Sequence, residues 1–212
     1  MPVSDRLRRF GALLRDRPGR ALRFASAFVR GLWYAAYFRV SRPDVRIGLP
    51  FFAFARVSIE GPGRVRIGPR CFVMASVFRG LSIVTLSPEA EVEIGARCAL
   101  GGLTLRCRER VTLGDGVMTA ASLVQDVLFS DLAAAARSGA HATEAASVML
   151  GANVWLGLSS TVLCGTQLGD DDVVASGALC LRTSADPYAF VSGSPAGRSL
   201  PISRMLALKA HA

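Results

Sequence analysis

An aliphatic or similarly apolar residue recurs at every sixth position in the second half of the chain, and this period constrains the fold more than any other feature. The positions are Leu150, Leu156, Val162, Leu168, Val174 and Cys180. An α-helix repeats about every 3.6 residues, and a single strand of this length would be far longer than strands in globular proteins. A six-residue period is instead typical of the short, repeated strands of a parallel β-helix. We therefore predict an all-β prism in which these side chains point inward and stack.

Small residues occupy the other regular positions of the repeat. Gly151, Gly157 and Gly169 directly follow an aliphatic residue, and glycine lets the backbone turn there without a Cβ clash. The fourth residue after each aliphatic one is small or short, namely Val154, Ser160, Thr166, Asp172 and Ala178. Only 8% of the chain is aromatic, which suits a narrow interior.

Related four-residue phrases extend the repeat toward the N-terminus, beginning with VRIG at Val45–Gly48. The aliphatic residue before the glycine of each repeat is Ile47, Ile67, Ile94, Leu113, Leu150 or Leu168. Successive members of this series are 20, 27, 19, 37 and 18 residues apart. Eighteen residues, or three hexapeptides, make one turn of a three-sided prism. The separation of 27 predicts an insertion near Phe78–Pro88. The separation of 37 predicts a loop that projects from the prism at about residues 132–147.

Positive charge is concentrated in the first 42 residues, which hold ten arginines against two aspartates. Helical spacing of apolar residues predicts one or two helices across residues 5–38, with a break at Pro18-Gly19. Arginines beside aromatic residues suit an anionic membrane surface through residues 6–42. They equally suit an arm that packs on the prism or on a neighbouring subunit with its arginines in water. The basic segment carries no sequence motif typical of nucleic-acid recognition, so we expect no nucleic-acid partner.

These features divide the chain into three parts: a basic amphipathic helical arm over 1–42, a β-helix domain over 43–200, and a tail or short helix over 201–212. Charged residues 15–17 interrupt any apolar stretch at the start, so we expect no secretory signal. The expected location is cytoplasmic, peripheral on the inner face of the membrane. The five cysteines form no C-x-x-C pair, which argues against a zinc site or disulfide framework.

A nearly gap-free stretch, VMLGANVWLGLSSTVLCGTQLGDDDVVASGALC, runs from Val148 to Cys180 and is followed by the phrase GSPA at Gly193–Ala196. These motifs resemble the hexapeptide-repeat acyltransferases, most closely the branch that acetylates sugars, antibiotics and bacterial polysaccharides. Weaker similarity reaches back to about Val45. The resemblance implies a left-handed coil, a homotrimer, acetyl-CoA as donor and a carbohydrate acceptor. Ordinary parallel crossovers are right-handed, so the left hand follows from the resemblance alone.

In such trimers CoA lies in a groove between adjacent prisms, against their C-terminal coils. The matching positions here are Trp155, Ser159, Ser176, Gly177, Ala196 and Arg198. Ser176 and Gly177 would let the pantetheine arm approach the backbone, and Arg198 would face a phosphate. Each serine or glycine is equally compatible with a simple turn. Trp155, a large ring among small residues, is expected outside the prism, at a subunit contact or in the groove.

The general base of this family is a histidine at the end of a short sequence motif, one coil before the projecting loop. The matching stretch here, 125–131, has serine or aspartate in that position, and neither is basic enough when unperturbed. Of the two histidines, His211 is penultimate and His141 lies in the projecting loop. His141 is therefore the first catalytic candidate, although a loop histidine without a role remains open. The weaker candidates are Asp126, Ser130 and Asp131.

The sequence thus predicts an acyl-CoA-dependent O-acyltransferase, most directly one that acetylates a sugar hydroxyl in a bacterial polysaccharide or glycoconjugate. The missing histidine leaves a second prediction, a catalytically silent scaffold or partner subunit. Carbonic anhydrases built on the same prism bind zinc through three histidines, so two histidines argue against that class, and we predict no metal.

Overall fold

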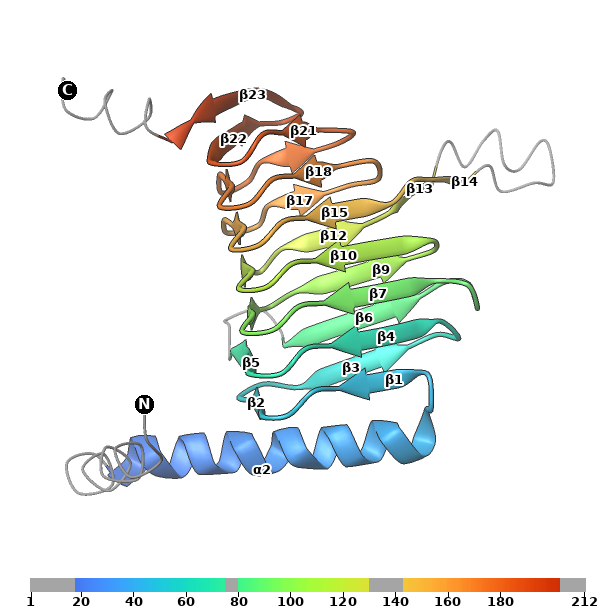
Figure 1. Cartoon of the computed structure of the whole chain (residues 1–212), viewed down its shortest axis with the longest axis vertical. Helices are drawn as coiled ribbons and strands as arrows, with labels where there is room; N and C mark the ends of the chain where they lie inside the picture. The colour runs from blue at the N-terminus through green and yellow to red at the C-terminus, as the bar shows by residue number, and fades with distance from the viewer. Residues whose placement is uncertain (1–17, 75–79, 130–142, 203–212) are drawn as a thin grey trace.

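The computed structural model describes residues 18–74, 80–129 and 143–202. Figure 1 shows a stack of coils with one long helix lying across its N-terminal end. Three parallel sheets form the walls of a three-sided prism of about six turns, and the chain adds a strand to each wall in turn. This is the left-handed parallel β-helix that the sequence predicts.

Each wall collects every third strand of the prism. Wall A consists of β1 (Val45–Ile47), β4 (Arg64–Ile67), β7 (Glu91–Ile94), β10 (Arg110–Leu113), β15 (Val148–Leu150), β18 (Gln167–Leu168) and β21 (Ser184–Ala185). Wall B consists of β2 (Phe51–Ala53), β5 (Cys71–Met74), β8 (Ala99–Gly101), β11 (Met118–Ala120), β16 (Trp155–Leu156), β19 (Val173–Val174), β22 (Ala189–Gly193) and β23 (Ala196–Pro201). Wall C consists of β3 (Val57–Glu60), β6 (Leu81–Thr85), β9 (Thr104–Cys107), β12 (Leu123–Gln125), β17 (Thr161–Val162) and β20 (Leu179–Cys180).

The six-residue ladder forms the core of the last coils, as predicted. Its six side chains are at most 4% exposed. They stack in register along each wall, for example Leu150 on Leu168 and Leu156 on Val174. The short residues at the fourth position are buried as well. Burying one aliphatic side chain contributes roughly 1.5–3 kcal/mol, so repeated stacking is the main stabilising term.

The corners between walls are turned by residues with positive φ. At the corner between walls B and C they are Gly102, Ala121, Ser159 and Gly177, with φ between 51° and 70°. An L-residue is strained in this region of φ. Each of the last two donates its N–H to a carbonyl of the preceding coil, Ser159 to Ala120 at 3.1 Å and Gly177 to Leu158 at 2.9 Å. These bonds recur from coil to coil and hold the corners in place.

The long second coil differs from the sequence prediction. Leu81–Thr85 is the regular strand β6, in which Ile83 pairs with Ile59 and with Leu105. The predicted insertion at Phe78–Pro88 is therefore wrong over this strand. Part of the extra length lies after it, in the segment 86–90 that leads to β7.

Helix α2 (Pro18–Ser41) packs on the first coil with a face of small residues. Ala21, Ala27 and Gly31 are buried on this face together with Phe38. A Cβ on Gly31 would lie 1.8 Å from the carbonyl oxygen of Phe51, so the helix backbone rests directly on β2. The arm thus packs on the prism, which is one of the arrangements that the sequence left open.

The end of α2 follows from its sequence. A proline disfavours helical geometry in the residue before it, and Pro43 comes directly after Arg42. Ser41 donates its hydroxyl to the Tyr37 carbonyl at 2.7 Å, and Arg42 donates its N–H to the Phe38 carbonyl at 2.8 Å. Within the part of the chain that the structure describes, no helix is long and apolar enough to cross a membrane.

The C-terminal end of the prism is covered by a strand that folds back. β23 pairs antiparallel with β22 at the edge of wall B. Of the predicted tail over 201–212, only Pro201 and Ile202 are described.

Candidate functional site

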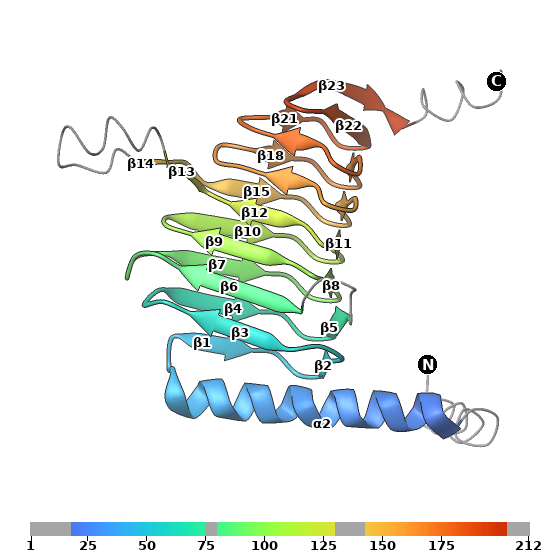
Figure 2. The same ribbon diagram turned by 180° about the vertical axis from the view of Figure 1, so that it is seen from behind.

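A hairpin leaves the prism at the corner between walls C and A (Figures 1 and 2). β13 (Val127–Phe129) pairs antiparallel with β14 (Thr143–Ala145). Glu144 of the hairpin forms an ion pair with Arg182 of a later coil. Three candidates for catalysis, Ser130, Asp131 and His141, lie outside the described residues, together with most of the predicted projecting loop.

Asp126 lies at the base of this hairpin and is completely buried. Its Oδ1 accepts a hydrogen bond from the N–H of Arg108 at 2.7 Å. Its Oδ2 accepts hydrogen bonds from the N–H of Glu109 at 2.7 Å and of Arg110 at 2.9 Å. A buried carboxylate is tolerated only when such bonds replace its hydration. The geometry is that of a structural clamp between coils, and a role for Asp126 as base stays a prediction.

The charge of Asp126 also affects nearby thiols. Burial raises the pKa of Cys107, and the negative charge of Asp126 raises it further. Burial likewise raises the pKa of Cys164, again with Asp126 as the second cause. Both effects keep the thiols protonated, so neither cysteine is a nucleophile in this environment.

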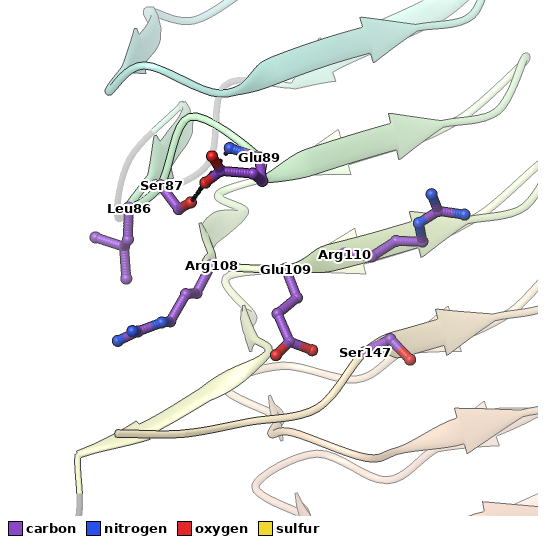
Figure 3. A pocket seen from close by; sticks show the side chains of 7 residues that line it. All are labelled: Leu86, Ser87, Glu89, Arg108, Glu109, Arg110 and Ser147. Carbon is purple, nitrogen blue, oxygen red and sulfur yellow. Dashed lines mark hydrogen bonds between the residues drawn. The ribbon is translucent and has the colours of Figure 1, made fainter. Parts of the chain in front are cut away.

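A cavity of about 620 Å³ lies at the same corner. Figure 3 shows the side chains that line it, which are Leu86, Ser87, Glu89, Arg108, Glu109, Arg110 and Ser147. They come from the segments that enter β7, β10 and β15, so three coils contribute to one site. Arg110 is held by Glu91 at 2.5 Å. The sequence does not reveal this cavity, because residues 86–88 fall within the predicted insertion at Phe78–Pro88.

The cavity is polar, and a hydrogen bond favours the ionised form of one of its acidic residues, Glu89. The hydroxyl of Ser87 donates to Glu89, and this hydrogen bond lowers the pKa of the Glu89 carboxyl. Guanidinium, carboxylate and hydroxyl groups thus line one opening, which offers both hydrogen-bond donors and acceptors.

Three of the candidate CoA residues lie at a different corner, between walls B and C of the last coils, namely Ser159, Ser176 and Gly177. Ser159 and Gly177 occupy successive turns of this corner, and Ser176 is exposed beside them. A Cβ on Gly177 would meet no atom within 4 Å, so its backbone is open to a ligand. Ala196 faces Gly193 where β23 folds back along the edge of wall B.

Trp155 begins β16 on the outside of wall B, where its ring is 51% exposed. Its neighbours in register are Met118 and Val173. The predicted position outside the prism is confirmed. Arg198 lies in β23 opposite Ser192.

The two groups of candidates are separated by wall C. The hairpin base and its cavity lie at the corner between walls C and A, whereas Ser159 and Gly177 lie at the corner between walls B and C. One prism therefore does not bring them together. Among the described residues, no group of three or more His, Cys, Asp or Glu side chains is arranged to hold a metal ion.

No protein-family model and no curated protein matches the sequence. Among solved structures, a mutant of AntD, an N-acyltransferase from Bacillus cereus in complex with dTDP and coenzyme A, matches with a TM-score of 0.50. The match covers 83% of this chain and 93% of that one at 13% identity. The chain has the fold of this acyltransferase. At such low identity the likeness establishes the fold alone.

Two further structures match at lower TM-scores. A galactoside acetyltransferase in complex with coenzyme A has 16% identity and a TM-score of 0.45, covering 84% of this chain and 80% of that one. The polysialic-acid-specific acetyltransferase NeuO has 15% identity and a TM-score of 0.46, covering 76% and 87%. The fold shared with AntD agrees with the resemblance to hexapeptide-repeat acyltransferases in the sequence.

Proposed function

We propose that this protein is an acyl-CoA-dependent O-acyltransferase with acetyl-CoA as donor. The observation that carries the proposal is the grouping of Ser159, Ser176 and Gly177 around one open corner of the last coils. This is where the sequence motifs place the CoA groove. Two structures with related folds contain coenzyme A, which supports the same cofactor here.

Acyl transfer to a hydroxyl needs a proton acceptor. The acceptor oxygen attacks the thioester carbonyl, and its proton passes to a base. The C–S bond then breaks, and the leaving sulfur takes the proton back from the base to give the CoA thiol. Backbone N–H groups are suitable donors to the oxyanion that forms in between. We assign the base to His141, because a neutral imidazole is basic near pH 7. Ser130 and Asp131 are weaker candidates, and Asp126 is the weakest because its oxygens are engaged by backbone donors.

We propose a sugar hydroxyl of a bacterial polysaccharide or glycoconjugate as acceptor. The charged and hydroxyl-bearing lining of the cavity at the hairpin base supports an acceptor of this kind. A cytoplasmic location, peripheral on the inner face of the membrane, belongs to the same proposal.

The separation of the two candidate groups supports a homotrimer. If adjacent prisms pack with the hairpin corner of one copy against the CoA corner of the next, each site contains both groups. Trp155 would then lie at or near the subunit cleft. Head-to-tail contacts between identical subunits generate a closed ring when the rotation between the copies closes.

The assignment of the base is tested by His141→Ala, with His211→Ala as matched control. Turnover of acetyl-CoA should be measured with a panel of sugar acceptors. We expect His141→Ala to lower turnover about 100-fold or more, the scale of general-base loss, while acetyl-CoA binding is retained. His211→Ala should behave as wild type. Unchanged turnover in His141→Ala would eliminate this residue as base.

A mixing experiment tests whether the site lies between copies. His141→Ala should be co-expressed with Ser176→Trp, whose ring would obstruct the CoA corner. Each variant alone is expected to be inactive. Random assembly into trimers with shared sites restores about one quarter of wild-type activity, because one in four interfaces then joins two intact halves. Absence of any recovery would contradict a shared site.

One observation favours a second function, that of a catalytically silent scaffold. In the stretch 125–131, serine or aspartate occupies the position at which the similar acyltransferases carry their histidine. A folded trimer that binds acetyl-CoA without turnover on any acceptor would have lost only its base. A trimer that binds no acetyl-CoA would share the fold of the acyltransferases and nothing more.

A further inference from the structure

The outer side of α2 is apolar although it faces solvent. Leu22 is 71% exposed, Val29 63%, Trp33 57% and Val40 88%. Their spacings of seven, four and seven residues place them on one side of the helix. The opposite side is the small-residue face that rests on β2. α2 therefore presents a continuous apolar strip away from the prism, which we call the outer strip.

The charges of α2 are all positive. The helix contains Arg20, Arg23, Arg30 and Arg39, and it contains no aspartate or glutamate. None of the ion pairs among the described residues involves these arginines. Arg23 and Arg30, seven residues apart, lie along one flank of the outer strip. An apolar strip bordered by arginines is the pattern of a helix that lies in a membrane interface.

An aromatic pair reinforces this pattern. Trp33 and Tyr37 stack with ring centroids 5.2 Å apart and an interplanar angle of 12°, and both rings are at least half exposed. Tryptophan and tyrosine are enriched where hydrocarbon meets headgroups. Both ribbon views show α2 at the very end of the stack (Figures 1 and 2). No other described element covers the outer strip, so a flat surface can reach it.

A groove of about 950 Å³ runs beside the outer strip, between α2 and wall A. Leu32, Ala36 and Arg39 line it from the helix. Arg46 and Arg66, which are register neighbours in β1 and β4, line it from wall A. Glu93 and Asp115 lie farther along the wall, so the positive side chains are nearest the helix. Guanidinium groups at this position suit phosphate.

We propose that α2 docks the protein on a lipid bilayer that contains anionic phospholipids. The outer strip enters the boundary between headgroups and acyl chains, and the flanking arginines meet headgroup phosphates. A second copy fits the strip less well, because two such helices would face each other with positive charge alone. The inference deepens the proposed peripheral location by assigning the membrane contact to α2, and it does not depend on the acyl-transfer chemistry.

The two tryptophans of the chain provide a matched pair of reporters. Trp33 and Trp155 are similarly exposed, at 57% and 51%, but only Trp33 lies on α2. Trp155→Phe leaves Trp33 as the single tryptophan, and Trp33→Phe leaves Trp155. With vesicles of phosphatidylcholine and phosphatidylglycerol carrying brominated acyl chains, we expect quenching of Trp33 and none of Trp155. Neutral vesicles should quench Trp33 less, and added salt should reverse the anionic effect.

Two double variants separate the strip from the charges, with residues 1–17 left intact. Val29→Glu/Val40→Glu should lower vesicle binding at least about tenfold, because it removes apolar area and adds negative charge. Arg23→Gln/Arg30→Gln should lower binding to anionic vesicles about 30-fold, since each basic residue near such a surface contributes a factor of about five. Arg70→Gln/Arg106→Gln, which changes two exposed arginines of the prism, should bind as wild type. Circular dichroism confirms that each variant is folded.

Three results would overturn the proposal. Equal quenching of both tryptophans would mean that the contact is not made by α2. Wild-type binding by both double variants of α2 would assign the contact to residues 1–17. The third result combines two observations. The wild type would not bind vesicles, and Val29→Glu/Val40→Glu would have a lower molecular mass than the wild type in light scattering without lipid. A second copy of the chain, and not a membrane, would then cover the outer strip.

Discussion

Replacing Asp126 by asparagine separates a structural role from a catalytic one. The substitution keeps the shape of the side chain but removes its charge and one acceptor oxygen. In the folded protein, Oδ1 serves the N–H of Arg108, and Oδ2 serves those of Glu109 and Arg110. Whichever way the amide is oriented, its NH₂ group faces at least one backbone donor. Asp126→Asn therefore leaves one or two buried N–H groups without an acceptor.

The cost can be estimated from these contacts. A buried donor without a partner costs about 1–3 kcal/mol, so Asp126→Asn should lower the free energy of unfolding by roughly 2–4 kcal/mol. Asp126→Ala leaves all three N–H groups without an acceptor and should lower the free energy of unfolding by about 4–5 kcal/mol. In a protein of this size, 1 kcal/mol corresponds to about 2–4 °C in Tm, so Asp126→Asn should lower Tm by on the order of 10 °C.

Thermal unfolding at fixed protein concentration measures the cost, and turnover of acetyl-CoA at 25 °C measures catalysis per folded protein. Asp170→Asn is the matched control, because Asp170 accepts one backbone N–H, that of Ala152 at 2.7 Å, at the surface. The control should cost less than about 1 kcal/mol. If Asp126 is structural, Tm falls and turnover survives in the folded fraction. A wild-type Tm for Asp126→Asn would refute the reasoning from the backbone clamp. If Asp126→Asn keeps the wild-type Tm but loses turnover at 25 °C, Asp126 is the base.

Two further substitutions and one labelling experiment have distinct expected outcomes. Gly31→Ala should lower the urea midpoint and speed amide exchange in α2, because its Cβ would lie 1.8 Å from the carbonyl oxygen of Phe51; Gly19→Ala, with no atom within 4 Å, is the control. Gly177→Ala should cost only about 1 kcal/mol of stability, the backbone penalty at φ 70°, since its Cβ meets nothing. A large loss of acetyl-CoA affinity in that variant would place Gly177 against the cofactor. The five thiols are all buried, and burial raises the pKa of Cys180 to about 11. Ellman's reagent at pH 8 should therefore label none of them until the protein is unfolded, and labelling of the native protein would contradict their burial.

The interior of the last coils was predictable because the repeat is local. Each coil imposes the same inward position on the next, so Leu150, Leu156 and Val162 could be assigned from spacing alone. The period does not say where extra residues leave the prism. In the second coil, Leu81 and Ile83 point inward as in any strand of wall C, yet the count of residues suggested an insertion there. The alternation of LSIVT was the signal for a strand, and the count obscured it.

The candidate site was less accessible to sequence reasoning for a physical reason. Backbone N–H groups are donors whatever the side chain, so the clamp on Asp126 by residues 108–110 has no signature in the sequence. The same holds for Gly31, whose importance depends on the carbonyl of a residue in another element. Helical periodicity predicted α2, but the arm is apolar on two sides. Spacing therefore left open which side meets the prism.

The hexapeptide period also determines which residues can share a site. Residues eighteen apart, such as Ser159 and Gly177, occupy the same corner of successive coils, whereas residues six apart, such as Ser159 and Gly165, occupy different corners. The hairpin replaces a turn at the corner of Gly165, so no coil of the same prism places it beside Ser159. Contact between the two corners must come from a neighbouring copy. If the proposed reaction uses both corners, its rate per subunit must fall when dilution separates the copies, even though every prism remains folded.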